Sequence, residues 1–442
     1  MRHQLGWADL AGSRVGIFGA GLEGRTAALR LADLTDDIVV VDDRPAGNLG
    51  EREVIATDAG GASLLASCDV VIKSPGISAY REDVAALERA GVAVVGGVGL
   101  TVHEADPSRV VCITGTKGKS TTSSVLGHLA AAAGLRVEVT GNIGRPPFDP
   151  SIPADLDLLV IETSSFQALD VADAPGIVVV TSLDVDHLDW HGTVERYQAD
   201  KLSLTSLPDA GRTLVPADDP TLRAQVDRLG GDVTWVPGPD RDWTDALGMA
   251  GRHNAINAEL AAAVLRALEI PLGSDPDALR EAAAGYDGLP GRFREIGRRG
   301  DVRFIDDGLA TNVLPTLAAL RSLEGQRLAI LVGGHDRGID YAELIDALAS
   351  RSAPTMVIGL PESGTRLVAA VSGTGSGTES AAVGSIDEAV DLADGWIGDE
   401  GVVLLSPAAP SFSQFANWKE RSEAFAGAVR RRIDDAHRRP EA

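Results

Sequence analysis

The sequence predicts an α/β protein of three domains: a Rossmann-like N-terminal domain, a central P-loop ATPase-like domain with a parallel or mixed sheet, and a C-terminal Rossmann-like domain. Short apolar runs alternate with Ala- and Leu-rich helical segments along the chain, which is the pattern of βαβ units. Glycine-rich or polar loops follow these runs, where parallel sheets place their ligands. The length of 442 residues fits about three domains, and we expect them at 1–99, 100–288 and 289–442.

The first domain opens with a glycine-rich loop between a strand and a helix. An apolar run at 14–18 predicts the strand, the motif GAGLEG at 19–24 the loop, and residues 25–32 the helix. A second strand at 38–41 leads to Asp42, whose carboxylate could hold a ribose hydroxyl as in dinucleotide-binding folds. A single GxGxxG motif is a weak signal. It fits a nucleotide-like ligand other than NAD, NAD itself, or a purely structural turn.

A second loop is expected at the same edge of this sheet. A strand at 70–72 leads into the sequence KSPGI at 73–77, and a helix at 84–90 and a strand at 92–95 complete the unit. Because parallel strands end at a common edge, both loops are predicted to lie on the same side of the sheet.

The central domain is organised around the sequence TGTKGKSTT at 114–122, between a predicted strand at 110–113 and a predicted helix at 123–133. Backbone N–H groups at a helix N-terminus, together with the helix dipole, favour a bound anion. The strict Walker spacing requires a glycine where Ile113 stands. The context still favours a nucleoside triphosphate site, and the alternative is a glycine-rich turn with a solvated lysine.

In a phosphate site of this kind, Lys119 would reach the outer phosphates, and Ser120 or Thr121 would offer a hydroxyl group to magnesium. Glu162 ends a strand predicted at 157–161, where a second magnesium ligand belongs.

Two further polar stretches follow in the central domain. The sequence SLDVDHLDWH at 182–191 comes after a predicted strand, and it fits either metal or phosphate chemistry or an ordinary polar loop. Lys201 lies on a later helix, where a surface lysine is the default interpretation. Asn254 and Asn257 are three residues apart, so they share a helix face and could grip one ligand, although Asn254 could also cap the helix.

The third domain is predicted to begin after a linker, LPGRF, at 289–293. Strands are predicted at 302–305, 328–332, 354–358 and 402–405. The first, second and fourth of them end in the polar loops DDGLATN, GGHDRG and SPAAPSFSQF. All three domains are thus expected to carry parallel sheets with polar residues at the strand ends.

Composition excludes several classes of function. The net charge of −24 argues against nucleic acid, because a phosphate backbone requires a basic face. Cys68 and Cys112 form neither a disulfide framework nor a metal pattern, which indicates the reducing cytoplasm. We expect no membrane insertion, since no apolar run approaches the length of a transmembrane helix and no signal peptide is visible.

Taken together, these motifs resemble the Mur ligase superfamily, the ATP-dependent enzymes that form amide bonds in peptidoglycan synthesis. The resemblance covers the whole chain and includes TGTKGKSTT, GNIG at 141–144, ETSSFQ at 162–167, DHLDWHG at 186–192, YQADK at 197–201, RHNAINA at 252–258, LPGRF and ATN at 310–312. The ending SPAAPSFSQFANWKERSEAF resembles the MurD branch, which adds glutamate to UDP-N-acetylmuramoyl-L-alanine. The first domain of that branch holds uridine, so the resemblance assigns the GxGxxG motif to UDP rather than to NAD.

The resemblance implies a monomeric enzyme that uses ATP and Mg²⁺. ATP would phosphorylate the carboxylate of UDP-N-acetylmuramoyl-L-alanine, and the glutamate amine would attack the resulting acyl phosphate. The implied catalytic residues are Lys119, His187 and Lys201, the last carbamylated by CO2. The implied metal ligands are Ser120, Thr121, Glu162, His187 and carbamylated Lys201.

The resemblance also implies two sets of binding residues. The ATP-binding residues are Gly115, Thr116, Lys117, Gly118, Lys119, Ser120, Thr121, Asn254, Asn257, Arg292 and Asp307. The substrate-binding residues are Gly21, Leu22, Asp42, Asp43, Arg44, Ser74, Gly76, Asn142, Ser164, Gln167, Thr311, Arg337, Ser411 and Trp418.

One position departs from the pattern of the family. A lysine usually precedes ATN and helps to hold the incoming D-glutamate, but this sequence has Leu309. Loss of a cation changes how a carboxylate is bound, so the sequence favours the smaller group of relatives that add L-glutamate. The alternatives are the D-glutamate ligase, a folylpolyglutamate synthase-like ligase, an NAD-dependent dehydrogenase and a nucleotide-binding protein without enzymatic activity.

Overall fold

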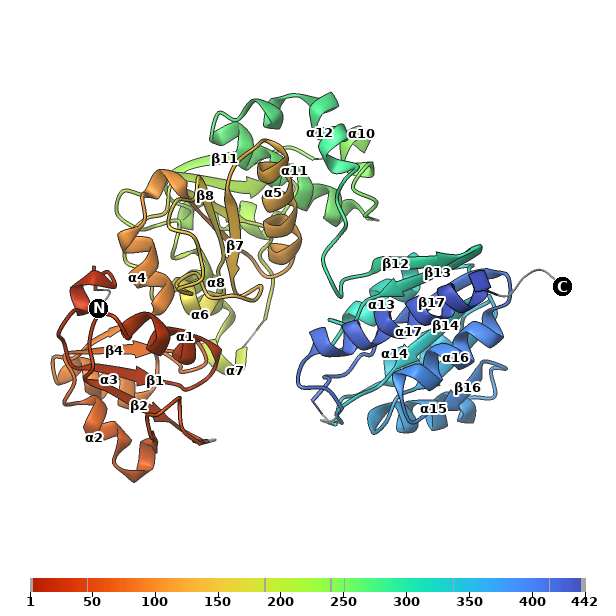
Figure 1. Cartoon of the computed structure of the whole chain (residues 1–442). Helices are drawn as coiled ribbons and strands as arrows, with labels where there is room; N and C mark the ends of the chain where they lie inside the picture. Colours follow the sequence, from red (N-terminus) through yellow and green to blue (C-terminus); the bar gives the residue numbers. More distant parts are fainter. Residues whose placement is uncertain are drawn as a thin grey trace. The chain divides into compact units, whose positions relative to one another are not determined.

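The structure is a computed structural model that describes residues 3–45, 47–186, 188–238, 241–249, 251–336, 338–412 and 414–438. The chain forms two compact units, residues 1–286 and 287–442, drawn from red to green and from teal to blue in Figure 1. Two sheets lie in the first unit and one in the second. The predicted α/β class is confirmed, while the three domain boundaries stay a prediction.

The first sheet is parallel, with the strand order β3-β2-β1-β4-β5. The strands are β1 Val15–Phe18, β2 Ile38–Asp42, β3 Val54–Ala56, β4 Val70–Lys73 and β5 Ala93–Val95. The helices are η1 Ala8–Leu10, α1 Leu22–Leu31, η2 Thr57–Ala59, α2 Gly61–Leu65, α3 Glu82–Arg89 and α4 Gly97–Glu104. The strand order reverses between β1 and β4, and such a switch point opens a crevice at the strand ends.

The second sheet is also parallel, with the order β11-β10-β9-β6-β8-β7. Its strands are β6 Val110–Thr114, β7 Val137–Gly141, β8 Leu158–Glu162, β9 Ile177–Val180, β10 Arg212–Pro216 and β11 Asp232–Val236. The helices are η3 Pro107–Arg109, α5 Lys119–Ala132, α6 Ser165–Ala168, α7 Leu188–His191, α8 Val194–Leu202, α9 Pro220–Ala224, η4 Val226–Arg228, α10 Arg241–Asp245, α11 Arg252–Ala267, η5 Pro271–Ser274 and α12 Pro276–Ala283.

Strand β6 shows why this sheet is buried on both faces. Val111 and Ile113 belong to the apolar core that includes α5 and α11, while Val110 and Cys112 belong to the core on the opposite face. Successive side chains of a strand point to opposite faces, so an unbroken apolar run is what a covered parallel strand requires. The glycine loop that follows β6 is therefore held at the edge of a rigid sheet.

The third sheet has the order β12-β13-β17-β14-β15-β16. Its strands are β12 Arg294–Arg299, β13 Asp301–Asp306, β14 Leu328–Val332, β15 Thr355–Gly359, β16 Glu379–Ala382 and β17 Glu400–Leu405. The helices are α13 Val313–Ser322, α14 Ala342–Ala349, α15 Ser363–Gly373, α16 Ile386–Ile397 and α17 Trp418–Arg438. Figure 1 shows these helices packed around the sheet.

The expectation of a wholly parallel third sheet was wrong, because β12 runs antiparallel to β13. Only Gly300 separates the two strands, and its φ of +57° suits a tight turn. A parallel neighbour would need a crossover of a dozen residues or more, so the short connection dictates the antiparallel hairpin. Charged residues along β12 also suit an edge strand.

None of the helices that the structure describes is long and apolar enough to cross a membrane.

Gly24 is the third glycine of the first loop, and its substitution is expected to destabilise the protein. A Cβ atom at Gly24 would overlap the carbonyl oxygen of Gly19. Gly24→Ala should lower the free energy of unfolding by about 1–3 kcal/mol, the usual cost of overpacking. The matched control is Gly21→Ala, because Gly21 has an ordinary φ of −71° and nothing near its Cβ position. Equal denaturant midpoints for the two variants would contradict this explanation.

Candidate active site

The loop between β6 and α5 forms a cradle of backbone N–H groups at the edge of the second sheet. Gly115 and Gly118 have φ values of +137° and +92°, which side chains rarely tolerate. Cβ atoms there would overlap Thr181 and Asn257, respectively. Asn257 of α11 therefore lies directly against the loop.

The cradle is fixed by the segment that follows β9. The N–H groups of Thr116 and Lys117 donate to the carbonyl and hydroxyl oxygens of Ser182, both at 2.9 Å. The Thr116 hydroxyl group also lies 2.9 Å from the hydroxyl of Tyr197 on α8. The Lys117 ammonium is largely exposed and pairs with Asp186 at 3.2 Å. These bonds hold the loop open at a helix N-terminus, the arrangement that suits phosphate.

Lys119 and Lys201 meet at a single carbonyl oxygen. The Lys119 ammonium donates to the Gly115 carbonyl at 2.9 Å, and the Lys201 ammonium donates to the same oxygen at 3.0 Å. Lys201 is only 2% exposed, so the interpretation of a surface lysine is wrong. Burial, with the neighbouring charge of Lys119, lowers the pKa of Lys201 to about 7. The two amines are therefore close neighbours, and an anionic group beside them would be favoured.

Glu162 lies beside the cradle with one carboxylate oxygen unused. Strand β8 pairs with β6 and β7, which places Glu162 opposite Ile113 and Gly141. Its Oε1 atom accepts a hydrogen bond of 2.9 Å from the amide of Asn142. Its Oε2 atom is buried and has no hydrogen-bond partner. An orphaned carboxylate oxygen of this kind is suited to a hard cation such as Mg²⁺.

The metal-binding prediction is only partly covered by the structure. His187 lies outside the described residues, and within those residues no three His, Cys, Asp or Glu side chains gather as a metal site. Ser120 is buried at the first turn of α5, next to Lys119, and Thr121 follows it. Helix α11 begins at Arg252 with Gly251 as its N-cap, so Asn254 is not the capping residue.

A hydrogen-bond network beside Lys201 could not be anticipated from the sequence. His191 is fully buried; its ring lies 2.7 Å from Asp200 and 2.9 Å from the hydroxyl of Ser165. The hydroxyl of Tyr80, which follows the first sheet's β4, donates to Asp200 at 2.8 Å. The network therefore connects the first sheet to helix α8, where Asp200 directly precedes the buried Lys201.

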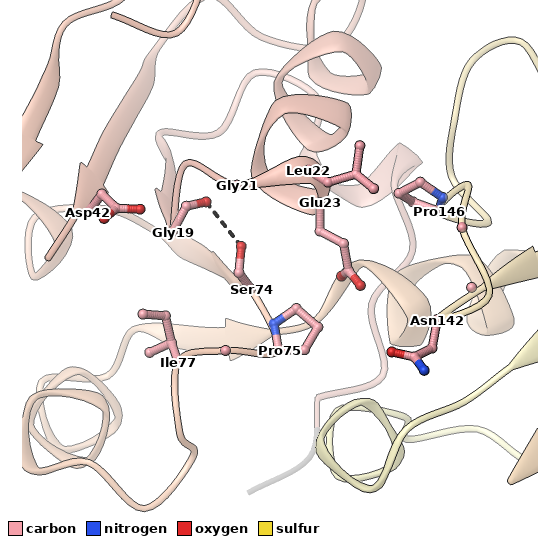
Figure 2. A pocket seen from close by; sticks show the side chains of 13 residues that line it. Gly19, Gly21, Leu22, Glu23, Asp42, Ser74, Pro75, Ile77, Asn142 and Pro146 are labelled. Atoms are coloured by element: carbon pink, nitrogen blue, oxygen red, sulfur yellow. Dashed lines mark hydrogen bonds between the residues drawn. The ribbon is translucent and has the colours of Figure 1, made fainter. Parts of the chain in front are cut away.

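A pocket of about 410 Å³ opens at the switch point of the first sheet. It contains six of the residues predicted to bind substrate: Gly21, Leu22, Asp42, Ser74, Gly76 and Asn142. Figure 2 shows the loops after β1 and β4 on one side and Asn142 and Pro146 of the second sheet's domain on the other. The pocket thus joins the GxGxxG loop to the segment beside Glu162.

Asp42 and several further residues predicted to bind substrate have hydrogen-bond or ion-pair partners within the protein. Asp42 accepts hydrogen bonds from the backbone N–H groups of Ala20 and Arg44. Asp43 forms an ion pair with Arg81, which lowers the pKa of that carboxyl group. Ser164 caps α6, and Gln167 completes the capping box with it.

Glu23 was missed as a site residue, although it lies within the GxGxxG motif. It lines the pocket, and its Oε1 atom accepts a hydrogen bond of 2.6 Å from the Gln167 amide. Burial is the main cause that raises the pKa of Glu23 to about 7. Nearby, Lys73 is buried and paired with Asp170 at 3.0 Å. For Lys73, the signal available in the sequence was its position directly after the strand predicted at 70–72.

In the second unit, polar residues gather at the ends of β13, β14 and β17. Asp307 accepts hydrogen bonds from the Ser406 hydroxyl at 2.7 Å and the Phe293 N–H at 3.2 Å. Burial raises the pKa of Asp307 to about 7. The predicted ATP contact Arg292 lies in the linker next to Phe293. Ser411 is buried in the loop after β17, and Thr311 is half-buried after β13. Arg337 lies outside the described residues.

Leu309 and Trp418 come together around Gly291. The Leu309 N–H donates to the Gly291 carbonyl at 2.8 Å, and a Cβ atom at Gly291 would meet the Trp418 ring at 2.6 Å. Arg421, which is 1% exposed and was not predicted, donates to the carbonyl oxygens of Gly308 and Ala409. One buried guanidinium group thus braces two of the strand-end loops.

Comparisons with known proteins agree with this arrangement. Residues 113–236 match the Mur ligase middle domain, and residues 291–409 match the Mur ligase glutamate ligase domain. A UDP-N-acetylmuramoyl-L-alanine–L-glutamate ligase from Salinispora tropica is 40% identical, over 96% of this chain and 98% of the relative. A protein of the same name from Xanthomonas axonopodis pv. citri is 36% identical over 95% of each chain.

A solved structure shares the fold. The UDP-N-acetylmuramate-alanine ligase MurC from Thermotoga maritima aligns with a TM-score of 0.57 and 16% identity, over 95% of this chain and 100% of that one. The sequence identity to the curated relatives extends over nearly the whole length on both sides. The chain therefore belongs to the Mur ligases, the family of ATP-dependent enzymes that form amide bonds.

Proposed function

We propose that this enzyme adds L-glutamate to UDP-N-acetylmuramoyl-L-alanine in peptidoglycan synthesis, through an acyl phosphate made with ATP. The main support is the 40% identity, over 96% of the chain, to a relative that bears the name of this activity. The two buried free cysteines, Cys68 and Cys112, fit an enzyme that works in the cytoplasm, and we propose that it does so as a monomer.

In this proposal the cradle binds the phosphates of ATP. The N–H groups at the N-terminus of α5 face the anion, and Lys119 neutralises charge that develops on the outer phosphate. Asn257, packed against Gly118, and Asn254 on the same helix contact the nucleotide. Arg292 and Asp307 are proposed as further ATP contacts.

The described residues fit Mg²⁺ at the outer phosphates. The buried, unpartnered Glu162 Oε2 atom would supply one oxygen, and the hydroxyl groups of Ser120 and Thr121 would supply others. The ion, when bound, would polarise phosphoryl oxygens and neutralise their charge. His187 is proposed as a further ligand.

Lys201 is proposed to act as a carbamate formed with CO2. Its amine is buried beside the Lys119 ammonium, a position that disfavours a second positive charge. A carbamate would replace that charge with oxygen donors, which a hard metal requires and an ammonium group cannot provide. Tyr197 packs against the Lys201 ammonium at 4.9 Å and helps to hold the side chain.

The pocket at the first sheet is proposed to hold the UDP portion of the substrate. Its residues Gly21, Leu22, Asp42, Ser74 and Gly76 surround the switch-point crevice, and Asp43 and Arg44, which follow Asp42 in the chain, are proposed as further contacts. Asn142 lines this pocket and donates to Glu162, so the acceptor carboxylate would lie toward the ATP site, and Ser164 and Gln167 are proposed as further contacts.

The incoming amino acid is proposed to bind at the strand ends of the second unit. Leu309 and Trp418 both lie next to Gly291 in this region, and Thr311, Ser411 and Arg337 are proposed as polar contacts. Leu309 stands where the family usually has a lysine, and this change is our reason for proposing L-glutamate, whose side chain leaves Cα in the opposite direction.

The enantiomer of glutamate can be tested directly. The enzyme is given UDP-N-acetylmuramoyl-L-alanine, ATP and either enantiomer, and phosphate release is measured. We expect kcat/KM for L-glutamate to exceed that for D-glutamate by at least about tenfold, since a missing charge-assisted bond costs about 1.5–3 kcal/mol. Leu309→Lys restores a cation and should reduce the ratio of kcat/KM for L-glutamate to kcat/KM for D-glutamate. A clear preference of the unmodified enzyme for D-glutamate would leave the D-glutamate ligase as the function.

A further inference from the structure

The pocket proposed for UDP contains a carboxyl group where the charge of the ligand is expected. Glu23 lies in the first turn of α1, and Figure 2 shows its carboxyl group directed into the pocket between Pro75 and Asn142. A helix N-terminus after a glycine loop is where a phosphate group binds. Glu23 and the diphosphate of a nucleotide sugar would therefore compete for the positive electrostatic potential at the N-terminus of α1.

Among the described residues, the charged groups that act on Glu23 do not neutralise it. Lys73 on β4 is the nearby cation, but it is bound to Asp170 at 3.0 Å in a buried ion pair. Asp170 itself repels a carboxylate at Glu23. Asp42 across the loop is engaged with the backbone of Ala20. A deprotonated Glu23 would thus face a bound diphosphate without a cation of its own.

The orientation of Gln167 determines which oxygen of Glu23 can carry a proton. The Oε1 atom of Gln167 accepts a hydrogen bond from the Ser164 N–H within the capping box of α6. The amide NH2 group is therefore turned toward Glu23, where it donates to Oε1. Glu23 Oε1 is an acceptor in this bond, so a proton would reside on Oε2 and could be donated to the ligand.

We propose that Glu23 couples the binding of the nucleotide sugar to the uptake of one proton, so that its neutral carboxylic acid donates a hydrogen bond in the complex. This inference rests on the proposed function, because it takes the pocket to be the UDP site. The neutral acid removes the repulsion of the diphosphate and keeps the bond from Gln167. Burial already raises the pKa of Glu23 to about 7, so protonation near neutral pH requires little free energy.

The coupling predicts how affinity changes with pH. Below a pKa of about 7 the free protein already holds the proton, so Kd should be constant. Above it, each binding event must take up a proton, and Kd should be about tenfold larger at pH 8 than at pH 6. Glu23→Gln keeps the shape and cannot lose a proton, so its Kd should be nearly independent of pH.

Isothermal titration calorimetry of the full chain with UDP-N-acetylmuramoyl-L-alanine tests the proposal. Neither the diphosphate diester nor the alanine carboxylate titrates between pH 6 and pH 8. Titrations at pH 8 in two buffers of different ionisation enthalpy give the number of protons taken up, which should approach one for the unmodified enzyme and zero for Glu23→Gln. Glu82→Gln, at the first turn of α3 and outside the pocket, is the matched control and should behave as the unmodified enzyme.

Lys201 and Asp307 also have a pKa near 7, so the difference between the unmodified enzyme and Glu23→Gln decides the test. A pH profile and proton uptake that survive in folded Glu23→Gln would overturn the proposal. A Kd of the unmodified enzyme that does not change between pH 6 and pH 8 would also overturn the proposal, without reference to any variant. Absence of binding at every pH would instead refute the assignment of the pocket to UDP, and with it the proposed function.

Discussion

Replacing Lys119 with alanine is expected to lower ligase turnover by at least about 100- to 1,000-fold, the cost of removing one preorganised charge-stabilising group. Lys119 stands at the first position of α5 and is held on the cradle by the carbonyl oxygens of Gly115 and Thr116. Its loss would leave the charge on the outer phosphate of ATP without its nearest cation. Phosphate release with UDP-N-acetylmuramoyl-L-alanine and glutamate measures the effect.

The fold should tolerate this change, because Lys119 is only partly buried at the edge of the sheet. Thermal unfolding of Lys119→Ala should therefore resemble that of the unmodified enzyme. Arg109→Ala, which removes an exposed cation ahead of β6, serves as the control and should keep its turnover. Near-normal turnover of Lys119→Ala would refute the role of Lys119 in ATP binding.

Replacing Lys201 with alanine is expected to reduce turnover to a similar extent, with partial recovery when acetate or formate is added. Lys201 is buried, and its amine lies next to the Lys119 ammonium at the Gly115 carbonyl. Truncation to alanine would open a space of the length of the side chain, which a short carboxylate could enter. The added anion would supply the oxygen donors that the proposed carbamate provides.

Lys201→Met separates this explanation from simple loss of structure. Methionine fills most of the same space, so added carboxylates should not restore its turnover. Recovery of Lys201→Met to the same extent as Lys201→Ala would show that the carboxylates act elsewhere. Full turnover of Lys201→Ala in buffer free of bicarbonate would exclude a carbamate at this position.

The cradle could be predicted from the sequence because its signals are local. A strand, a glycine loop and a helix follow one another within residues 110–133, and the chemistry of the loop depends on its own backbone. Glu162 was also predictable, since a strand end carries its side chain to the same edge of the sheet as the cradle.

Residues whose role depends on packing were not predictable in this way. Taken alone, Lys201 would be interpreted as a surface lysine, and only the family resemblance singled it out; its burial results from the packing of α8 against the cradle. The contact between Tyr80 and Asp200 joins residues 120 positions apart. The periodicity of apolar residues describes one segment at a time and gives no information about contacts between distant segments. The antiparallel strand β12 was not predicted at all, because its charged sequence, Arg294–Arg299, contains no apolar run.

The order of strands in the second unit sets the order in which that unit can form during synthesis. Strand β17 is the last of the sheet along the chain, yet it lies in the middle, between β13 and β14. While the ribosome adds residues 307–399, the nascent hairpin of β12 and β13 and the strands β14 to β16 have no common partner, and their open edges invite pairing with other chains. Residues 1–286 form both of their sheets without this delay. Chaperones that bind nascent chains are therefore expected to act mainly on the second unit, until β17 has left the ribosome.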